Sequence, residues 1–440
     1  MNNAITSRSE LPKVIAASSI GTLIEWYDFF IAGAAASSVW PLVFFPKNNP
    51  IAAVTLSIST FGLTYFTRPV AAFLFGHLGD RMGRRTTLVW TLIAMAVAMF
   101  GIAFTPAYSS IGVAAPILIS VFRLVQGLGI GGEWQGGIVW ATEFVSSKES
   151  RGFWASLVQL ANSLGLSFGT LAFFLVRSVL PAQSFLSYGW RIPFLIGGLV
   201  VVVGFIIRYK MTESPLFKEI QRRGSREAVP SMSVWKTHWP KILLFAVITS
   251  YVIIVENLNL NPFGITYMTA EGIGSRFVFL AIAAGAAFSG VPLVLGAALS
   301  DKVGRRTPLL ISTVLTAASV YPFYLMVNTL NPSLIVVATM LLFGVTYVGY
   351  GVLPIAFAEQ FPTKFRYSGV GWSFQIGALI SGVILVVVLP EVVQISHGPV
   401  NSWPYLVLVS LIITLAAMAS SLTLKKPEKD EFATNASGGQ

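Results

Sequence analysis

The sequence contains no cysteine and unusually few charged residues. Of its 440 residues, 0 are Cys, 3 are His, and 11% are Asp, Glu, Lys or Arg. The absence of cysteine excludes disulfides, thiolate metal sites and iron–sulfur clusters. The three histidines lie far apart in the sequence and at span ends, so we expect no metal site. We also expect no bound cofactor. A soluble domain carries about 25% charged residues, and this chain therefore cannot be a series of ordinary soluble domains.

The abundant residues are apolar, with 55% hydrophobic residues and a mean hydropathy of +0.74. They form twelve segments, each close to or above the ~20 residues that a helix needs to cross the hydrocarbon of a bilayer. We therefore predict an all-α membrane protein with twelve transmembrane helices. The segments lie near residues 14–38, 52–76, 87–105, 111–142, 153–177, 190–209, 241–268, 277–299, 308–328, 333–357, 368–390 and 403–424.

Basic residues gather on one side of these segments. Of the 29 Lys and Arg, 23 fall in the two tails and alternate loops, and four fall in the opposite loops. By the positive-inside rule, both termini are expected in the cytoplasm of a multi-pass protein of the cell membrane. The net charge of +11 then reflects topology and contact with lipid head groups, and we expect no nucleic-acid partner.

The halves of the chain resemble each other. A polar, basic loop at 210–240 is predicted to link an N-terminal six-helix half, 1–209, to a C-terminal half, 241–424. The tail, 425–440, is predicted to be disordered. One loop motif recurs 221 residues later in the second half, which indicates two parallel repeats. The first copy comprises Asp80, Arg81, Gly83, Arg84 and Arg85, and the second comprises Asp301, Lys302, Gly304, Arg305 and Arg306.

The repeated loops predict an electrostatic latch on the cytoplasmic side. Their glycines permit a tight turn, and their aspartates suit the positive N-terminus of a helix. Their arginines can pair with acids in two further loops, and the alternative is simple anchoring of loops by basic residues. The residues expected to take part in these further loops are Glu143 and Arg151 in the first half, and Glu359 and Arg366 in the second.

The repeated loops resemble the signature of the major facilitator superfamily. Three further segments are similar to its metabolite:proton symporter family: Glu25-Trp26-Tyr27-Asp28, Arg68-Pro69, and Arg123 through Gly131-Gly132-Glu133-Trp134. The resemblance implies two six-helix halves related by a pseudo-two-fold axis along the membrane normal. It also implies inner-membrane, proton-coupled uptake of a small organic acid, such as a mono- or dicarboxylate or a shikimate-like acid, by alternating access.

Six charged residues lie inside predicted spans, where a charge at mid-bilayer costs about 2.5–3.5 kcal/mol. We hypothesise that two arginines bind a substrate carboxylate, because a guanidinium stays charged and holds a carboxylate in a fork. The acids are candidates for carrying the proton. The alternative is a permanent ion pair between helices. The arginines are Arg68 and Arg123, and the acids are Asp28, Glu25, Glu133 and Glu256.

Polar residues elsewhere in the spans are candidates for binding the parts of the substrate other than its carboxylate. The stretch from Glu256 to Pro262 predicts a break in span seven, with backbone groups freed toward a cavity. Ordinary polar contacts between helices are the alternative. The candidates for substrate binding are Asn257, Asn259, Asn261, Gln159 and Gln375, with Asn162 and Tyr350 as further lining residues.

Other functional classes fit less well. Gly127-x-Gly129-x-x-Gly132 matches a dinucleotide fingerprint, but it lies in an apolar helix with no strand before it, so close helix packing is the preferred interpretation. No catalytic motif points to an enzyme. We expect a monomer whose partners are a small-molecule substrate, H+ and membrane lipid. A proline/betaine symporter and an uncoupled facilitator or exporter of the same fold remain alternatives.

Overall fold

The computed structural model describes residues 2–82, 84–142, 145, 150–209, 230–362 and 366–424. Within these ranges it describes only the backbone at 2–10, 17, 76, 79–82, 84–85, 133, 135, 140, 207–209 and 230. Among the described residues, twelve helical segments are long and apolar enough to cross a membrane. The predicted number of spans is therefore confirmed.

The N-terminal half forms spans one to six. Long apolar segments fold as helices because, without water, the backbone must satisfy its own hydrogen bonds. Its helices are α1 (Asn2–Ser38), α2 (Trp40–Val43), α3 (Pro50–Gly62), α4 (Thr64–Met82), α5 (Arg84–Phe104), α6 (Tyr108–Ile111), α7 (Ala114–Thr142), α8 (Arg151–Val179), α9 (Ala182–Ser184), the π-helix η2 (Phe185–Gly189) and α10 (Arg191–Tyr209).

The C-terminal half forms spans seven to twelve. Its helices are α12 (Pro230–Asn259), α13 (Phe263–Ala270), α14 (Ser275–Val303), α15 (Arg306–Val327), α16 (Pro332–Tyr350), α17 (Leu353–Ala358), α18 (Arg366–Val383), the π-helix η4 (Ile384–Val388), α19 (Leu389–Ile395), the 3-10 helix η5 (Val400–Ser402) and α20 (Trp403–Leu422). Helix α12 begins at Pro230, so the end of the predicted 210–240 linker is helical and leads into span seven, with a kink at His238.

The predicted break in span seven is present between α12 and α13. The chain turns at Leu260, Asn261 and Pro262, where the amide of Asn261 donates to the Glu256 carbonyl at 2.9 Å. These residues are buried. A break of this kind is tolerated at membrane depth because protein, rather than lipid, surrounds the freed backbone groups.

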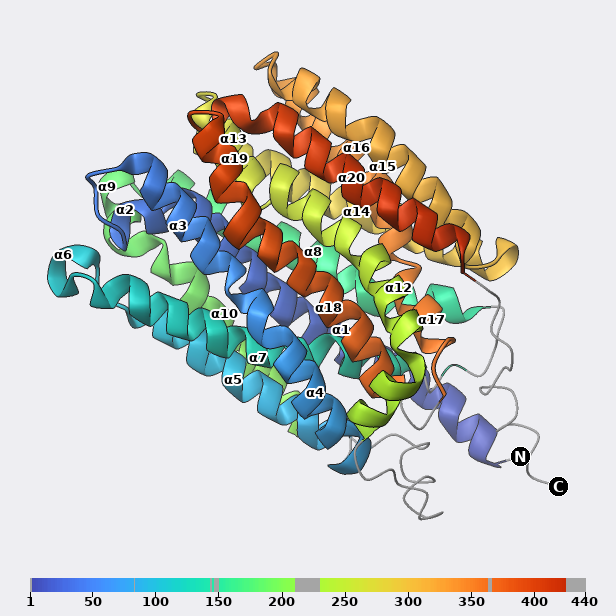
Figure 1. Ribbon diagram of the computed structural model, residues 1–440. Coiled ribbons are helices and arrows are strands. Elements are labelled where there is room, and N and C mark those ends of the chain that lie inside the picture. Colours follow the sequence, from blue (N-terminus) through green and yellow to red (C-terminus); the bar gives the residue numbers. More distant parts are fainter. Residues whose placement is uncertain are drawn as a thin grey trace.

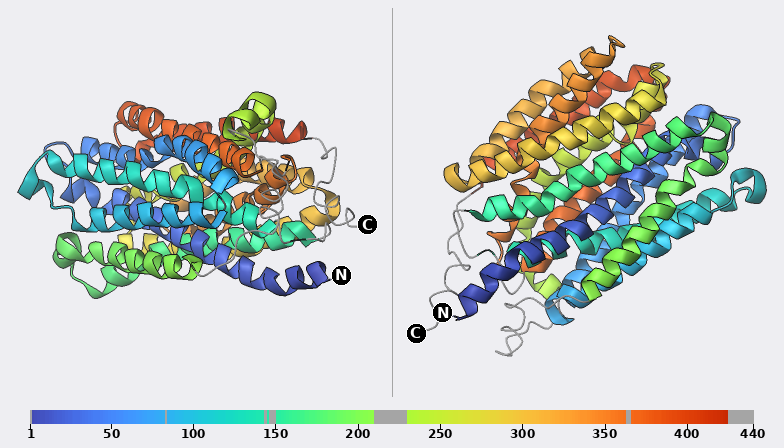
Figure 2. Two further views of the ribbon diagram at one scale, coloured as in Figure 1. Left: turned by 90° about the horizontal axis from the view of Figure 1, so that it is seen from below. Right: turned by 180° about the vertical axis from the view of Figure 1, so that it is seen from behind.

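The first six and the last six of the spans found among the described residues lie side by side (Figure 1). Two helix pairs form the seam between them, α8 with α14 and α4 with α18, and the view from behind shows the same division (Figure 2). Helix α1 packs on α7 and α8 at the centre of the first half, while α12 packs on α18 and α20 in the second. The centre of the molecule therefore lies among α1, α4, α7, α12 and α16.

The outside of the bundle is apolar. Large apolar side chains such as Trp90, Leu199, Leu295 and Leu408 are exposed along the spans, as contact with lipid requires. Helix α1 begins and α20 ends at one end of the bundle (Figure 1), which we call the terminal end. The other end, which holds α2, α6, α9 and α13, is called the distal end.

Candidate functional site

The structure brings five of the six predicted intramembrane charges to the centre of the bundle. Glu25 and Asp28 come from α1, Arg68 from α4, Arg123 from α7 and Glu256 from α12. Four are 0% exposed and Glu256 is 5% exposed. The sixth, in α7 at position 133, has a side chain outside the described part of the structure. Charges at this depth are costly unless they are paired or functional.

Arg123 has its hydrogen-bonding partners within the first half. Its Nη1 donates to Oε1 of Gln126, and its Nη2 donates to the Phe61 carbonyl at 2.8 Å. The Phe61 ring centroid lies 4.6 Å from the guanidinium carbon. The Asp28 carboxylate interacts with the Gln126 side chain and with the charge of Arg123. Arg123 is therefore held in place by α3 and α7, and its charge acts on Asp28.

Arg68 differs, because none of its three nitrogens has a hydrogen-bond partner among the described residues. Its guanidinium carbon lies 4.8 Å from the Phe29 ring centroid and 4.5 Å from that of Tyr65. The nearby charges are those of Glu25 and Glu256. A buried guanidinium without an acceptor is costly, so this group is suited to an anion that the protein does not itself supply.

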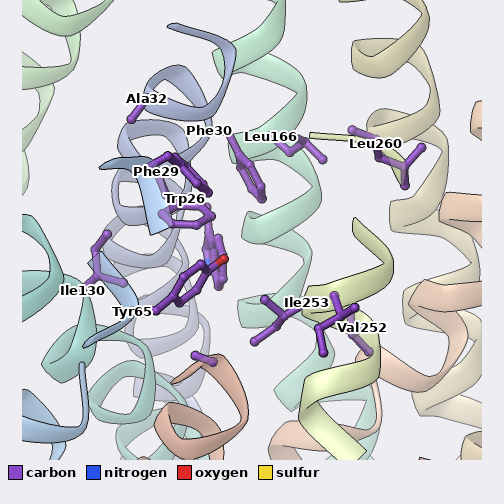
Figure 3. Close-up of a cluster of buried hydrophobic side chains, with 14 of the residues drawn as sticks. Trp26, Phe29, Phe30, Ala32, Tyr65, Ile130, Leu166, Val252, Ile253 and Leu260 are labelled. Atoms are coloured by element: carbon purple, nitrogen blue, oxygen red, sulfur yellow. The ribbon is translucent and has the colours of Figure 1, made fainter. Parts of the chain in front are cut away.

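Aromatic and aliphatic side chains surround this level of the bundle (Figure 3). Phe29 and Trp26 of α1 and Tyr65 of α4 lie together on one side, and Ile253 of α12 lies across from them. All are buried. An apolar surrounding of this kind excludes water and strengthens electrostatic interactions among the groups inside it.

Hydrogen bonds connect the two halves beside Arg68. Asn257 of α12 donates through Nδ2 to the Tyr65 hydroxyl of α4 at 2.6 Å and to Oγ of Ser381 in α18 at 2.9 Å. The Tyr347 hydroxyl of α16 donates to Oε2 of Glu256 at 2.9 Å. The predicted site residues Asn257 and Glu256 thus lie at the interface between the halves, close to Arg68.

A second polar group lies between α8 and α16. Asn162 donates through Nδ2 to the Tyr350 hydroxyl at 3.4 Å, and Gln159 also interacts with that hydroxyl. Oε1 of Gln159 accepts a bond from Nε1 of Trp134 at 2.8 Å. Tyr350 is in turn close enough to Arg68 to interact with its charge. The structure therefore adds Gln159, Asn162 and Tyr350 to the same neighbourhood.

Two of the predicted asparagines lie elsewhere. Asn259 donates to Oγ of Ser410 in α20 at 3.0 Å and accepts from the Tyr324 hydroxyl of α15 at 2.8 Å, so it joins helices within the second half. Asn261 is buried at the distal side of the break, where its side chain meets Gly33 of α1. Asn259 therefore fits the alternative of a polar contact between helices.

Both ends of the central site are closed. At the terminal side, Trp134 of α7 stacks on Phe374 of α18 with ring centroids 3.9 Å apart. Gln375 of α18 donates to the Gly131 carbonyl at 3.4 Å. At the distal side, the Ser37 hydroxyl of α1 hydrogen-bonds to the Pro262 carbonyl at 2.6 Å. Each contact joins one half to the other, so the central charges are enclosed from both ends.

In the second copy of the repeated loop, Asp301 and Arg305 contact two further segments of the chain. Oδ1 and Oδ2 of Asp301 accept bonds from the amides of Gly152 and Phe153 at 2.9 and 3.0 Å, at the start of α8 in the other half. Arg305 donates to Asp301 at 2.6 Å and holds Glu359 through two bonds of 2.7 and 3.0 Å. The aspartate thus lies at a helix N-terminus, where a negative charge is favoured.

The backbone and charge of this loop follow from its sequence. Gly304 has φ of +86°, a region that favours glycine. Burial alone would lower the pKa of Arg305, but hydrogen bonds and charges from Glu359 and Asp301 raise it above its ordinary value. Arg305 therefore stays charged at any physiological pH.

The other predicted latch residues take different positions. Arg306 is exposed, Arg151 is buried at the start of α8, and Nε of Arg366 donates to the Ala358 carbonyl at 3.0 Å. The remaining members lie outside the described side chains, namely Asp80, Arg81, Gly83, Arg84, Arg85 and Glu143.

Sequence reasoning overlooked three groups of the central site. Gln126 stands three residues after Arg123 in the same helix, and this spacing places two side chains on one face, so it was within reach of prediction. Tyr65 and Tyr347 carry no local signal, because their roles depend on Asn257 and Glu256, which are distant in sequence.

Comparison with known proteins agrees with this architecture. The family model of the Major Facilitator Superfamily matches residues 19–372. The inner membrane metabolite transport protein YhjE of Escherichia coli (strain K12) is 32% identical over 383 residues, covering 84% of this chain and 86% of that protein. The shikimate transporter of the same strain is 30% identical over 388 residues, covering 86% of each.

Two further proteins are similar over nearly the whole chain. The proline/betaine transporter of Salmonella typhimurium (strain LT2) is 28% identical over 440 residues, covering 97% of this chain and 86% of that protein. The structure of the proton:xylose symporter XylE bound to 6-bromo-6-deoxy-D-glucose has a TM-score of 0.77 at 15% identity, covering 94% of this chain and 95% of that one. The latter likeness concerns the fold alone.

The family match, the relatives and the twelve helices in two sets of six agree with one another. The chain belongs to the major facilitator superfamily and is a multi-pass inner-membrane transporter.

Proposed function

We propose that the protein is a proton-coupled symporter that takes up a small organic acid by alternating access. The observation that carries this proposal is Arg68, a fully buried guanidinium that contacts two aromatic rings and has no hydrogen-bond partner among the described residues. A guanidinium binds a carboxylate through two parallel bonds. Arg68 is therefore the proposed ligand of the substrate carboxylate.

Charge balance supplies the reason for coupling. Glu25 and Glu256 are the acids whose charges act on Arg68. A substrate carboxylate bound to Arg68 neutralises its positive charge, which otherwise stabilises the negative charges of these acids. A buried carboxylate left without a cation is strongly unfavourable. A proton bound together with the substrate cancels the charge that the substrate adds, so the net charge of the enclosed site is the same when loaded as when empty.

Asp28 is the second proposed participant in proton transfer. It is fully buried and interacts with Gln126 and Arg123 within the first half. Since Arg123 already has two acceptors and an acid partner, its proposed role is to hold Asp28 rather than the substrate. Glu133 is a further candidate for the proton, as predicted from the sequence.

The remaining expectations from the sequence are part of the same proposal. The division of basic residues, 23 against four, supports a cytoplasmic terminal end. The proposed domains are the halves 1–209 and 241–424, the linker 210–240 and the tail 425–440. The contacts of Asp301, Arg305 and Glu359 support a latch that stabilises closure at that end.

The test uses the full chain in proteoliposomes with an imposed pH gradient, acid on the uptake side. Labelled shikimate, succinate and glycine betaine are the probes. We expect a carboxylate to accumulate only with the gradient, and Arg68→Gln to abolish both binding and accumulation. Arg177→Gln, at the distal end of α8, is the matched control and should retain both. Accumulation that is unchanged in a folded Arg68→Gln protein would contradict the proposal.

The proline/betaine alternative is tested in the same assay. A similar transporter carries that name, and aromatic rings bind quaternary ammonium groups. In this site, however, the rings of Phe29 and Tyr65 already contact Arg68. Accumulation of glycine betaine without accumulation of a carboxylate would favour the alternative.

A further inference from the structure

We propose that the substrate is a monocarboxylate that carries several hydroxyl groups, and that Gln159, Asn162 and Tyr350 form its hydroxyl-binding subsite. The inference rests on the proposed function, because it takes Arg68 as the ligand of the carboxylate. It goes further by assigning the other end of the substrate to α8 and α16.

The first step concerns the number of carboxylates. Of the two central arginines, only Arg68 lacks hydrogen-bond partners among the described residues. Both terminal nitrogens of Arg123 donate to protein oxygens, those of Gln126 and Phe61, and its charge acts on Asp28. A dicarboxylate needs a second available cation at the site. The geometry therefore favours an acid with one carboxylate.

The second step concerns the neutral groups beside Arg68. Tyr350 interacts with the charge of Arg68, and its hydroxyl accepts a bond from Nδ2 of Asn162 at 3.4 Å. Gln159 lies near the same hydroxyl, and its Nε2 is buried without a hydrogen-bond partner among the described residues. Oδ1 of Asn162 is buried and accepts no bond from any described residue. The spacing of three residues places both amides on one face of α8. These groups offer donors and acceptors but no charge.

The third step matches this chemistry to a ligand. A hydroxyl both donates and accepts a hydrogen bond, so it can satisfy an amide oxygen and a phenol at once. A site built to bind hydroxyl groups rejects analogues that lack them, since its buried polar groups are then left unpaired. Apolar acids of the same shape should therefore bind poorly.

The test compares two acids that share one ring. Shikimate and 1-cyclohexene-1-carboxylate have the same ring and carboxylate, and only shikimate has the three hydroxyls. Isothermal titration of the purified full chain should give a Kd for shikimate at least about 100-fold lower, the effect of two hydrogen bonds. Succinate and glycine betaine should bind more weakly than shikimate.

Variants locate the subsite. The ratio to compare is the Kd of 1-cyclohexene-1-carboxylate divided by the Kd of shikimate. Tyr350→Phe and Asn162→Ala should each reduce this ratio by about tenfold, the effect of one hydrogen bond, because each variant weakens the binding of shikimate alone. Tyr251→Phe is the matched control, because its buried hydroxyl bonds Ser312 within the second half. Its ratio should equal that of the unmodified protein.

The outcomes separate this inference from the proposed function. Equal binding of the two ring acids, both lost in Arg68→Gln, would overturn the hydroxyl subsite and leave the organic-acid proposal standing. Tighter binding of succinate than of shikimate would overturn the choice of a monocarboxylate in the same way. Failure of every acid to bind the unmodified protein would overturn both. The ratio of the two Kd values of the unmodified protein tests the hydroxyl-binding subsite even if a variant does not fold.

Discussion

At the scale of single residues, the two central arginines illustrate how hydrogen bonds assign different roles to the same side chain. Both Arg68 and Arg123 are fully buried and lie on aromatic rings. Arg123 donates to the Phe61 carbonyl and to Gln126, whereas Arg68 has no such acceptor among the described residues. A buried donor without an acceptor is costly, and this cost is what a bound anion would relieve.

The first prediction concerns Asp28, the acid on which the charge of Arg123 acts. In Asp28→Asn the amide cannot gain and lose a proton, so we expect proton-driven accumulation of substrate to disappear and the accumulation ratio to fall to one. Counterflow exchange of substrate should continue, because it requires no net proton movement. Both are measured in proteoliposomes with the acid that the unmodified protein accumulates.

Glu391→Gln is the control for this prediction, because Glu391 is exposed in α19 at the distal end. It should accumulate substrate like the unmodified protein. If Asp28→Asn, and likewise Glu25→Gln, Glu133→Gln and Glu256→Gln, each still accumulate substrate against a gradient, proton coupling through these acids is excluded.

At the scale of helices, the glycines of α7 determine how closely it packs. A side chain at Gly127 would overlap the Thr64 carbonyl and the Thr67 hydroxyl of α4. A Cβ at Gly129 would lie 2.6 Å from Cγ of Met95 and 2.9 Å from the Thr91 carbonyl of α5. Small residues at these positions permit close approach of helices. The packing interpretation of the Gly127-x-Gly129-x-x-Gly132 pattern therefore agrees with the structure.

The second prediction compares two glycines of this helix. Gly127→Ala should lower the free energy of unfolding by about 1–3 kcal/mol, as overpacking does, because the obstacle includes the backbone of α4. Gly137→Ala should have little effect, since its nearest neighbour would be 3.4 Å away. Thermal unfolding in detergent, followed by tryptophan fluorescence, measures both. Equal stability of the two variants would contradict this account of α7.

At the scale of the whole molecule, contacts between the halves close both ends of the site. Trp134 with Phe374 and Asp301 with the start of α8 act on the terminal side, and Ser37 with Pro262 acts on the distal side. Alternating access requires the contacts at one end to break while the contacts at the other end stay intact. The strength of the contacts at each end therefore determines which end opens more readily.

The third prediction tests the contacts that close the terminal end. Asp301→Asn removes the charge that two amides of α8 and Arg305 bind, and such bonds contribute about 1.5–3 kcal/mol each when fully formed. We expect the terminal end to open more often, so that a cysteine at buried Ser156 of α8 reacts with a maleimide about tenfold faster. The chain has no other cysteine, and therefore labelling reports this position alone.

Glu391→Gln again serves as the control in the Ser156→Cys background and should leave the labelling rate unchanged. Because the pKa of Arg305 is raised above its ordinary value, its contribution is present at neutral pH and is lost only in strongly alkaline solution. Deprotonation of Arg305 therefore should not change labelling between pH 6 and 9. A labelling rate that Asp301→Asn leaves unaltered would refute the latch.

Much of the architecture was predictable from local sequence. Twelve spans follow from apolar length, since each helix must satisfy its own backbone in lipid, and the break before Pro262 follows from the polar residues around it. The recurrence of Asp301, Gly304 and Arg305 indicated a charged turn beside a helix N-terminus, because both have local sequence requirements. Because charged residues are scarce, the sequence pointed to six acids and arginines inside the spans. The structure brings five of these six residues together at its centre.

The tertiary structure alone decided which of those residues act together. Asn257 and Asn259 are two positions apart in one helix, yet Asn257 contacts Tyr65 across the seam while Asn259 contacts Tyr324 and Ser410 within its own half. The difference between Arg68 and Arg123 depends likewise on Phe61, which lies on another helix. Local sequence determines how a segment folds, but the partners of a buried polar group depend on how segments pack, and that depends on residues far away in the chain.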